Sequence, residues 1–170
     1  MRRCQDGDRE AFGQLIARYQ KPVFNAALRL LRNPEDARDV AQTTFLKAFE
    51  HLASYEPRFK FYSWIYRIAV NEALDALGAK KPVEEISGEE QDEAPGPERR
   101  VESEQMSRAI EDALMRIKPE FRAVMVLRHF MHLSYQDMSD ILLIPEKTVK
   151  SRLYTARQLL RDDLARQGAF

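Results

Sequence analysis

The sequence predicts an all-α protein of two small helical domains joined by an acidic linker that contains proline and glycine. Apolar residues recur at helical spacing on both sides of the linker, and no segment shows the alternation typical of a strand. Residues 82–97 contain three prolines, two glycines and an acidic run, with few apolar groups to bury. We therefore place the first domain at 1–82, the linker at 83–104 and the second domain, with a helix-turn-helix, at 105–170.

Charge follows the same division, although the whole chain of 170 residues has a formal net charge of zero. Residues 1–82 hold 14 Lys/Arg and 10 Asp/Glu, residues 83–104 hold 2 and 9, and residues 105–170 hold 11 and 8. The three segments thus carry +4, −7 and +3. Two mildly basic domains suit a polyanionic partner, but charges this small identify none by themselves.

Composition excludes several classes of protein. Apolar residues make up 44% of the chain, which is enough for a core. The longest apolar runs, 123–127 and 141–144, are far shorter than the roughly 18 residues that span a bilayer, and no apolar signal segment follows Met1. Cys4 is the only cysteine, which excludes internal disulfides and thiolate metal clusters. We expect a cytoplasmic protein without a metal, a cofactor or insertion into a membrane.

The first domain is expected to contain about four helices. Phe12, Leu15, Ile16 and Tyr19 fall on one face of a helix that Pro22 ends or bends, and apolar spacing resumes from Phe24 to Leu31. Asn33 and Pro34, followed by two acids, mark the start of the next helix. That helix is expected to bury Ala37, Val40, Ala41, Phe45, Ala48, Phe49 and Leu52. A further helix is expected from about Ser63 to Leu77.

The second domain is also expected to contain about four helices. Apolar spacing predicts one helix from Met106 to Ile117 and a second that opens at Pro119. A short helix from Ser134 and a longer one from about Pro145 then describe a helix-turn-helix. In the longer helix, a basic and aromatic row lies beside the apolar stripe, as expected for a helix placed in a major groove. The alternative is an ordinary amphipathic helix with solvated charges, but the preceding short helix favours DNA binding.

A second candidate DNA surface is the aromatic segment 55–67, which holds six aromatic residues interleaved with basic ones. Aromatic rings stack on unpaired bases while basic groups follow the backbone, so the segment suits single-stranded or opened DNA. Trp64, Arg67 and Asn71 share one helical face beside the buried one. The alternative is that most of these aromatic residues belong to the core, and we expect this for Phe59, Ile65 and Ile68.

The outer face of the helix that starts near Glu35 is a third candidate surface. Acidic residues surround Leu46 on the side opposite the apolar stripe. An exposed aliphatic side chain in such surroundings hints at a protein partner.

Taken together, these segments resemble bacterial sigma factors of the extracytoplasmic-function (ECF) class. The resemblance covers nearly the whole chain and rests on four stretches in the family's order: 7–19, the start of domain 2; 34–49, the helix that docks on the polymerase; 61–71, the melting and minus-10 segment; and 133–157, the minus-35 helix-turn-helix. It implies a promoter-specificity factor that binds core RNA polymerase, recognises the minus-35 and minus-10 elements, supports promoter opening and has no catalytic residues of its own. Members are often held inactive by an anti-sigma factor until a stress signal arrives, so we expect such a partner here.

The resemblance also assigns residues to each partner. The polymerase-binding residues are expected to be Asp36, Asp39, Gln42, Phe45 and Leu46. Opened minus-10 DNA is expected to contact Arg58, Lys60, Phe61, Trp64, Arg67 and Asn71. Duplex minus-35 DNA is expected to contact Lys147, Thr148, Lys150, Ser151, Arg152, Tyr154 and Arg157. The acidic linker, through Glu84, Glu85, Glu89 and Glu90, would follow the RNA path of the polymerase.

Several positions depart from the family pattern. Thr43 stands where Glu is common, and Thr155 stands where Arg is common. Leu143 occupies the turn position where Gly is usual, and a left-handed backbone there would cost leucine roughly 1 kcal/mol or more. Lys147 replaces another frequent Gly, and residues 78–81 are less basic than usual at the end of domain 2.

Three other functions compete with this interpretation. A helix-turn-helix regulator with a helical sensing domain would explain the second domain but not the aromatic segment. An adaptor that binds only proteins would not need the basic row. An enzyme is the least favoured, because no acids or cysteines cluster with His129 and His132 to form a metal site.

Overall fold

The computed structural model describes residues 2–79 and 97–168, and the side chains of residues 3–79 and 106–168. These ranges are helical and contain no strand, in agreement with the predicted all-α class. The four glutamates proposed to follow the RNA path lie outside the described residues. Helix α5 begins at Pro97, so residues 97–104, which we expected in the linker, have helical backbone.

The first domain consists of four helices and one short 3-10 turn. They are α1 (Arg2–Gln5), α2 (Arg9–Leu31), α3 (Pro34–Glu50), η1 (Leu52–Ser54) and α4 (Phe61–Ala79). The predicted start of α3 is confirmed, because the Asn33 side chain accepts hydrogen bonds from the backbone N–H groups of Glu35 and Asp36 at 2.9 and 3.1 Å. Helix α2 is continuous through Pro22, so the helix does not end there.

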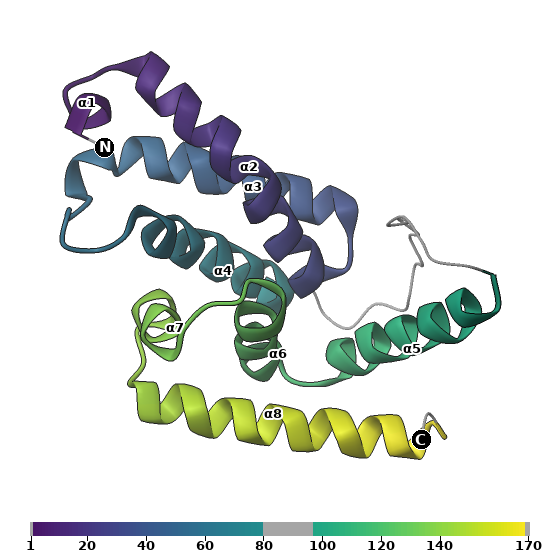
Figure 1. Ribbon diagram of the computed structural model, residues 1–170. Coiled ribbons are helices and arrows are strands. Elements are labelled where there is room, and N and C mark those ends of the chain that lie inside the picture. Colours follow the sequence, from purple (N-terminus) through teal and green to yellow (C-terminus); the bar gives the residue numbers. More distant parts are fainter. Residues whose placement is uncertain (1, 80–96, 169–170) are drawn as a thin grey trace.

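Helices α2, α3 and α4 pack against one another, and their facing apolar residues form the core of the first domain (Figure 1). The expected buried stripe of α3 is mostly confirmed, with one correction at Phe49. Its side chain is 48% exposed, although its ring still lies 5.3 Å from the ring of Phe12. Thr44 is fully buried on α3 instead, and its hydroxyl donates to the carbonyl of Val40 at 2.7 Å.

The second domain contains the predicted helix-turn-helix. Its elements are α5 (Pro97–Arg116), α6 (Pro119–Met125), the π-helical turn η2 (Val126–Phe130), α7 (Tyr135–Leu142) and α8 (Glu146–Arg166). Ser134 caps α7 in a reciprocal capping box with Asp137. The turn between α7 and α8 places Leu143 in the left-handed region with φ of 54°, as the usual glycine at this position suggests.

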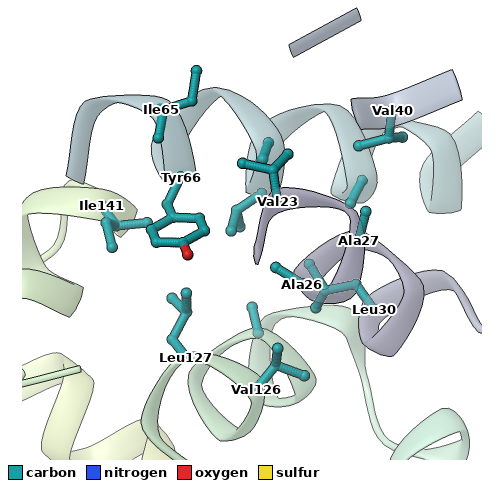
Figure 2. Close-up of a cluster of buried hydrophobic side chains, with 14 of the residues drawn as sticks. Val23, Ala26, Ala27, Leu30, Val40, Ile65, Tyr66, Val126, Leu127 and Ile141 are labelled. Carbon is teal, nitrogen blue, oxygen red and sulfur yellow. The ribbon is translucent and has the colours of Figure 1, made fainter. Parts of the chain in front are cut away.

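The two domains share one apolar core. Tyr66 of α4 points across the domain boundary toward Leu127 of η2, with Ile141 of α7 beside it (Figure 2). These three side chains are 6%, 0% and 1% exposed. Figure 1 shows the same arrangement, in which α7 and α6 lie against α4 and α8 runs along the far side. The second domain is therefore packed on the first.

A buried arginine joins the ends of helices from both domains. The Arg122 guanidinium is 3% exposed and donates to the carbonyl of Leu30 at 2.5 Å, at the end of α2. It also donates to the carbonyls of Leu114, Met115 and Ile117 around the end of α5, at 3.0, 2.7 and 3.3 Å. Carbonyls at helix ends lack partners within the helix, so one cation satisfies several of them. Burial lowers the pKa of Arg122 to about 10.

None of the described helices combines the length and the apolar character that crossing a bilayer requires.

Candidate nucleic-acid and polymerase interfaces

Helix α8 presents a polar face opposite its buried stripe. Val149, Leu153 and Ala156 are buried against the rest of the domain. Of the residues predicted to contact minus-35 DNA, Lys147, Lys150, Ser151, Tyr154 and Arg157 are exposed, while Thr148 and Arg152 are half-buried. A face of this kind, on the second helix of a helix-turn-helix, has the form that a major groove accepts.

Two of these side chains already have partners within the domain. The Lys150 ammonium lies 3.5 Å from the carboxylate of Glu146, one turn earlier, and 5.3 Å from the ring centre of Tyr135. Arg157 lies 3.4 Å from the His129 ring. Both contacts are at the surface, where such pairs are weak, so a phosphate can replace them at small cost.

The aromatic segment forms a cluster of rings at the start of α4. Tyr55 is buried, and its hydroxyl donates to the carbonyl of Phe59 at 2.6 Å. Trp64 packs edge-on against Tyr55 at 5.3 Å and lies 5.8 Å from the ring of Phe61. Trp64 is only half-buried, and Asn71, farther along α4, is exposed. Both residues therefore keep some contact with solvent, as the stacking hypothesis requires.

The basic residues predicted for minus-10 DNA are divided between solvent and the second domain. Arg58 is exposed, pairs with Glu56 at 2.6 Å and lies over the ring of Phe59. Lys60 and Arg67 instead bond to helix α7. Five of the six predicted minus-10 residues thus lie in the first turns of α4 or in the loop before it, and Asn71 lies near the middle of α4. Two of the six, Lys60 and Arg67, are engaged by the helix-turn-helix.

The sequence did not predict that Tyr62, Asp137 and Asp140 join α4 to α7. The hydroxyl of Tyr62 and the ammonium of Lys60 both donate to the Asp137 carboxylate, at 2.6 and 3.1 Å. Arg67 donates twice to the backbone carbonyl of Asp140, at 3.1 and 2.6 Å. The capping pattern Ser134-x-x-Asp137 identifies Asp137 in the sequence, but nothing there shows its contact with α4.

Asp137 is strongly held in its charged form. Burial alone would raise the pKa of its carboxyl group, but hydrogen bonds from Ser134, Tyr62 and Lys60 outweigh burial and bring that pKa to about 2. The same contacts raise the pKa of Lys60, through its hydrogen bonds with Tyr62 and Asp137. A full negative charge therefore faces α4 at neutral pH.

A groove of about 560 Å³ lies between α2 and α3. Its apolar lining is Ile16, Phe24, Ala41 and Phe45, and its polar lining is Gln20, Lys21, Arg38 and Gln42. Two residues predicted to bind the polymerase, Gln42 and Phe45, line this groove. Leu46 stands next to them on α3 with 59% of its side chain exposed, and Asp39 is exposed as well. All five predicted residues therefore lie on α3, and two of them line the groove.

His129 lies within η2, and His132 follows shortly after it. Among the described residues, no three His, Cys, Asp or Glu side chains are grouped so that they could hold a metal ion. Two causes lower the pKa of His129: burial of the ring is the larger, and the positive charge of nearby Arg157 is the next. Both favour the neutral ring. Cys4 is buried in the core of the first domain.

Comparison with known proteins assigns the two domains separately. Residues 15–82 match the family model "Sigma-70 region 2", and residues 107–160 match "Sigma-70, region 4". The two matches together define the class, the sigma-70 type of RNA polymerase specificity factor.

Similar proteins show to which group of sigma factors the chain belongs. The chain is 32% identical to the ECF RNA polymerase sigma factor SigW of Bacillus subtilis over 96% of this chain and 94% of the relative. It is 33% identical to the ECF RNA polymerase sigma-E factor of Escherichia coli, over 93% and 88%. The chain therefore belongs to the ECF RNA polymerase sigma factors, as the sequence motifs predicted.

Solved structures agree with this fold. The structure of CnrH in complex with the cytosolic domain of CnrY matches with a TM-score of 0.72 at 25% identity, covering 95% of this chain and 92% of that one. The sigma factor RpoE of Bartonella quintana, solved with the anti-sigma factor NepR, matches with a TM-score of 0.73 at 20% identity, covering 92% and 98%.

Proposed function

We propose that this sigma factor brings core RNA polymerase to promoters through three separate surfaces. Helix α8 reads duplex minus-35 DNA, the Trp64 end of α4 holds opened minus-10 DNA, and α3 with its groove docks on the polymerase. The polymerase performs the chemistry, so the chain itself is not an enzyme. Because its partner acts on chromosomal DNA, the chain works in the cytoplasm.

The observation that carries this proposal is the exposed face of α8. Lys150, Ser151 and Tyr154 point away from the core on a helix whose opposite side is buried. The first residues of such a helix meet base edges, and later basic residues hold phosphates. Thr155, half-buried here, is the departure that we expect to alter sequence preference.

Polymerase docking is supported by apolar surface on the first domain. Exposed Leu46 and the groove floor at Phe24 and Phe45 offer aliphatic and aromatic contacts within a polar rim. An apolar centre with a polar rim is the usual anatomy of a protein interface. The rival interpretation, a repressor with a sensing domain, gives this surface no role.

Minus-10 recognition is supported by Trp64, whose ring packs against neighbouring rings without being fully buried. Contacts with Tyr55 and Phe61 fix the orientation of Trp64, while its half-buried position leaves part of it open to a base. Stacking of a base on such a ring contributes roughly 1–3 kcal/mol. Asn71, exposed on the same face, would hydrogen-bond a base edge.

An anti-sigma factor is the remaining expected partner. One protein of the same fold was solved with such a factor, and we propose a comparable inhibitor for this chain, released by a stress signal.

The test separates the two DNA surfaces in the holoenzyme. Promoter opening is followed with a fluorescent base analogue in the minus-10 element, and promoter binding is followed by salt-dependent gel shift. Trp64→Ala should reduce opening by about fivefold or more while leaving the closed complex intact, since roughly 1–3 kcal/mol of stacking is lost. Lys150→Ala should weaken promoter binding and reduce its salt dependence, because one phosphate contact disappears.

The matched control is Lys118→Ala, which removes the same charge at the junction of α5 and α6, away from the first turns of α8. It should behave as the parent in both measurements. Equal opening by Trp64→Ala and parent would refute the stacking role. No promoter-specific initiation by the parent with core polymerase would refute the function as a whole.

A further inference from the structure

The end of η2 lies beside the polar face of α8. A guanidinium nitrogen of Arg157, a residue predicted to contact minus-35 DNA, lies 3.4 Å from Nε2 of His129 in η2. Arg128, the residue before His129, lies over the ring of Tyr135, and the Lys150 ammonium lies 5.3 Å from the centre of the same ring. Lys150 and Arg157 are two helical turns apart, or about 10 Å along α8. Side chains of η2 therefore meet the DNA-binding face of α8 directly at Arg157, and through Tyr135 at Lys150.

Hydrogen bonds hold the end of η2 in place. The N–H of Leu133 donates to the carbonyl of Leu127 at 3.1 Å, and the Arg128 guanidinium donates to the carbonyl of Leu133 at 2.7 Å. The turn is π-helical, a rare form that occurs frequently at functional sites. His129 is therefore presented from a fixed backbone, and its side chain reaches solvent.

The groups that act on His129 through their charge are all cationic or can become so. They are Arg157 of α8, Arg128 of η2 and His132, just after η2. Burial of the ring is the largest cause that lowers the pKa of His129, and these three charges follow it. Like charges gathered in this way repel one another unless an anion joins them.

The neighbouring helices do not change this balance. Helix α7 faces η2 with the ring of Tyr135. Helix α2 approaches η2 with Arg29, which lies 4.0 Å from Glu111. One turn after Arg157 on α8, Arg161 lies 3.8 Å from Asp162. Each of these two acids thus has a basic partner of its own, and the positive charge around His129 suits an anionic ligand.

We propose that protonated His129 and Arg157 together bind a phosphate of the DNA backbone beside the minus-35 element, so that DNA is held more tightly in mild acid than at neutral pH. A guanidinium and an imidazolium both favour an anionic oxygen. The pair also lies past the first turns of α8, where base edges are read, so its ligand is the backbone. This inference rests on the proposed function of α8, and it adds a histidine to the minus-35 residues that the sequence assigned.

The contact is linked to the uptake of one proton. In the free protein the guanidinium can only donate, so the neutral His129 ring accepts at Nε2 and carries its proton on Nδ1. A bound phosphate favours the imidazolium, so the pKa of His129 is higher in the complex than in the free protein. The added affinity is therefore complete below the pKa of the free protein, and it is lost as the pH rises through the pKa of the complex.

The experiment measures the affinity of the full chain for a fluorescent duplex that carries a minus-35 element. Titrations are made at about pH 5.5 and about pH 8, on either side of the ordinary histidine pKa. Binding of the holoenzyme to the complete promoter is followed in parallel. The parent protein should bind about fivefold or more tightly at the lower pH, and its salt dependence there should be steeper by about one phosphate contact.

Three variants isolate the contribution of His129. His129→Gln keeps an acceptor for Arg157 but cannot be protonated, so it should lack the gain of affinity in acid. His129→Lys is charged at both pH values, so it should bind as tightly at the higher pH as the parent does at the lower. The matched control is His51→Gln, which removes an exposed histidine at the end of α3 and should behave as the parent.

Nuclear magnetic resonance follows the protonation of His129 directly. The chain has three histidines, so the ring signal of His129 is assigned from its absence in His129→Gln. Its pKa should rise when the duplex is added, whereas the ring signal of His51 should not respond. An unchanged pKa of His129 in the complex, or an equal gain of affinity in acid by His129→Gln, would overturn the inference. Failure of the parent to bind the duplex at either pH would instead contradict the proposed function of α8.

Discussion

Arg122→Met should destabilise the protein more than any single loss of a surface ion pair. The substitution keeps most of the apolar stem but removes the donor of hydrogen bonds to four carbonyls, one on α2 and three around the end of α5. At about 1.5 kcal/mol for each bond to a charged group, their loss costs about 6 kcal/mol. Burial, which lowers the pKa of Arg122 to about 10, opposes part of this gain, because the variant no longer buries a charge. We therefore expect a net loss of about 3 kcal/mol or more, the range seen when one partner of a buried charged group is removed.

The assay is urea unfolding followed by far-ultraviolet circular dichroism at pH 7. Arg122→Lys keeps the charge but not the planar set of donors, so it should lose an intermediate amount. The control is Arg116→Met, whose parent side chain is 46% exposed and pairs with Asp163, and it should cost at most about 1 kcal/mol. If Arg122→Met unfolds within about 1 kcal/mol of the parent, the buried guanidinium does not join the domains as argued.

Two further predictions concern the helix-turn-helix. Leu143→Gly should leave the free energy of unfolding unchanged or raise it by up to about 1 kcal/mol, because the left-handed backbone strains leucine. Leu142→Gly, one residue earlier and within the helix, should lower the free energy of unfolding by about 1 kcal/mol or more. Equal losses for the two variants in urea titrations would contradict this prediction. Asp137→Asn should cost about 2 kcal/mol at pH 7, because the carboxyl pKa is about 2 in the folded protein and 3.8 without its partners. That contribution is complete above pH 3.8 and disappears as pH falls through 2, so parent and variant should converge in acid; a constant difference down to pH 2 would be inconsistent with it.

Much of the secondary structure was predictable because its signals are local. Asn33 and Ser134 cap helices from within three residues of their partners, and the apolar spacing of α8 follows from helix geometry alone. Phe49 was predicted in the core but is half exposed. Apolar spacing shows which residues share a helix face, but it does not show which of them a neighbouring helix covers. The sequence also left open whether a helix ends at Pro22, and the structure shows that α2 continues.

The candidate surfaces were predictable as lists of residues but not as an arrangement. Trp64, Asn71, Leu46 and the outer residues of α8 all reach solvent, as their predicted roles require. The engagement of Lys60 and Arg67 was not foreseen, because their partners lie 77 and 73 residues away in the sequence. Periodicity in the sequence does not predict contacts between residues that are so far apart along the chain.

The sequence by itself determined the helices, their caps, the division into two domains and, through its motifs, membership of the ECF sigma factors. These properties depend on interactions within a few turns of chain or on matches within one segment. Only the tertiary structure decided that the domains share a core, that Arg122 satisfies carbonyls of both, and that Asp137 faces Lys60 and Tyr62. Such contacts depend on how whole helices pack, and an apolar stripe specifies that it must be buried without specifying which helix will cover it.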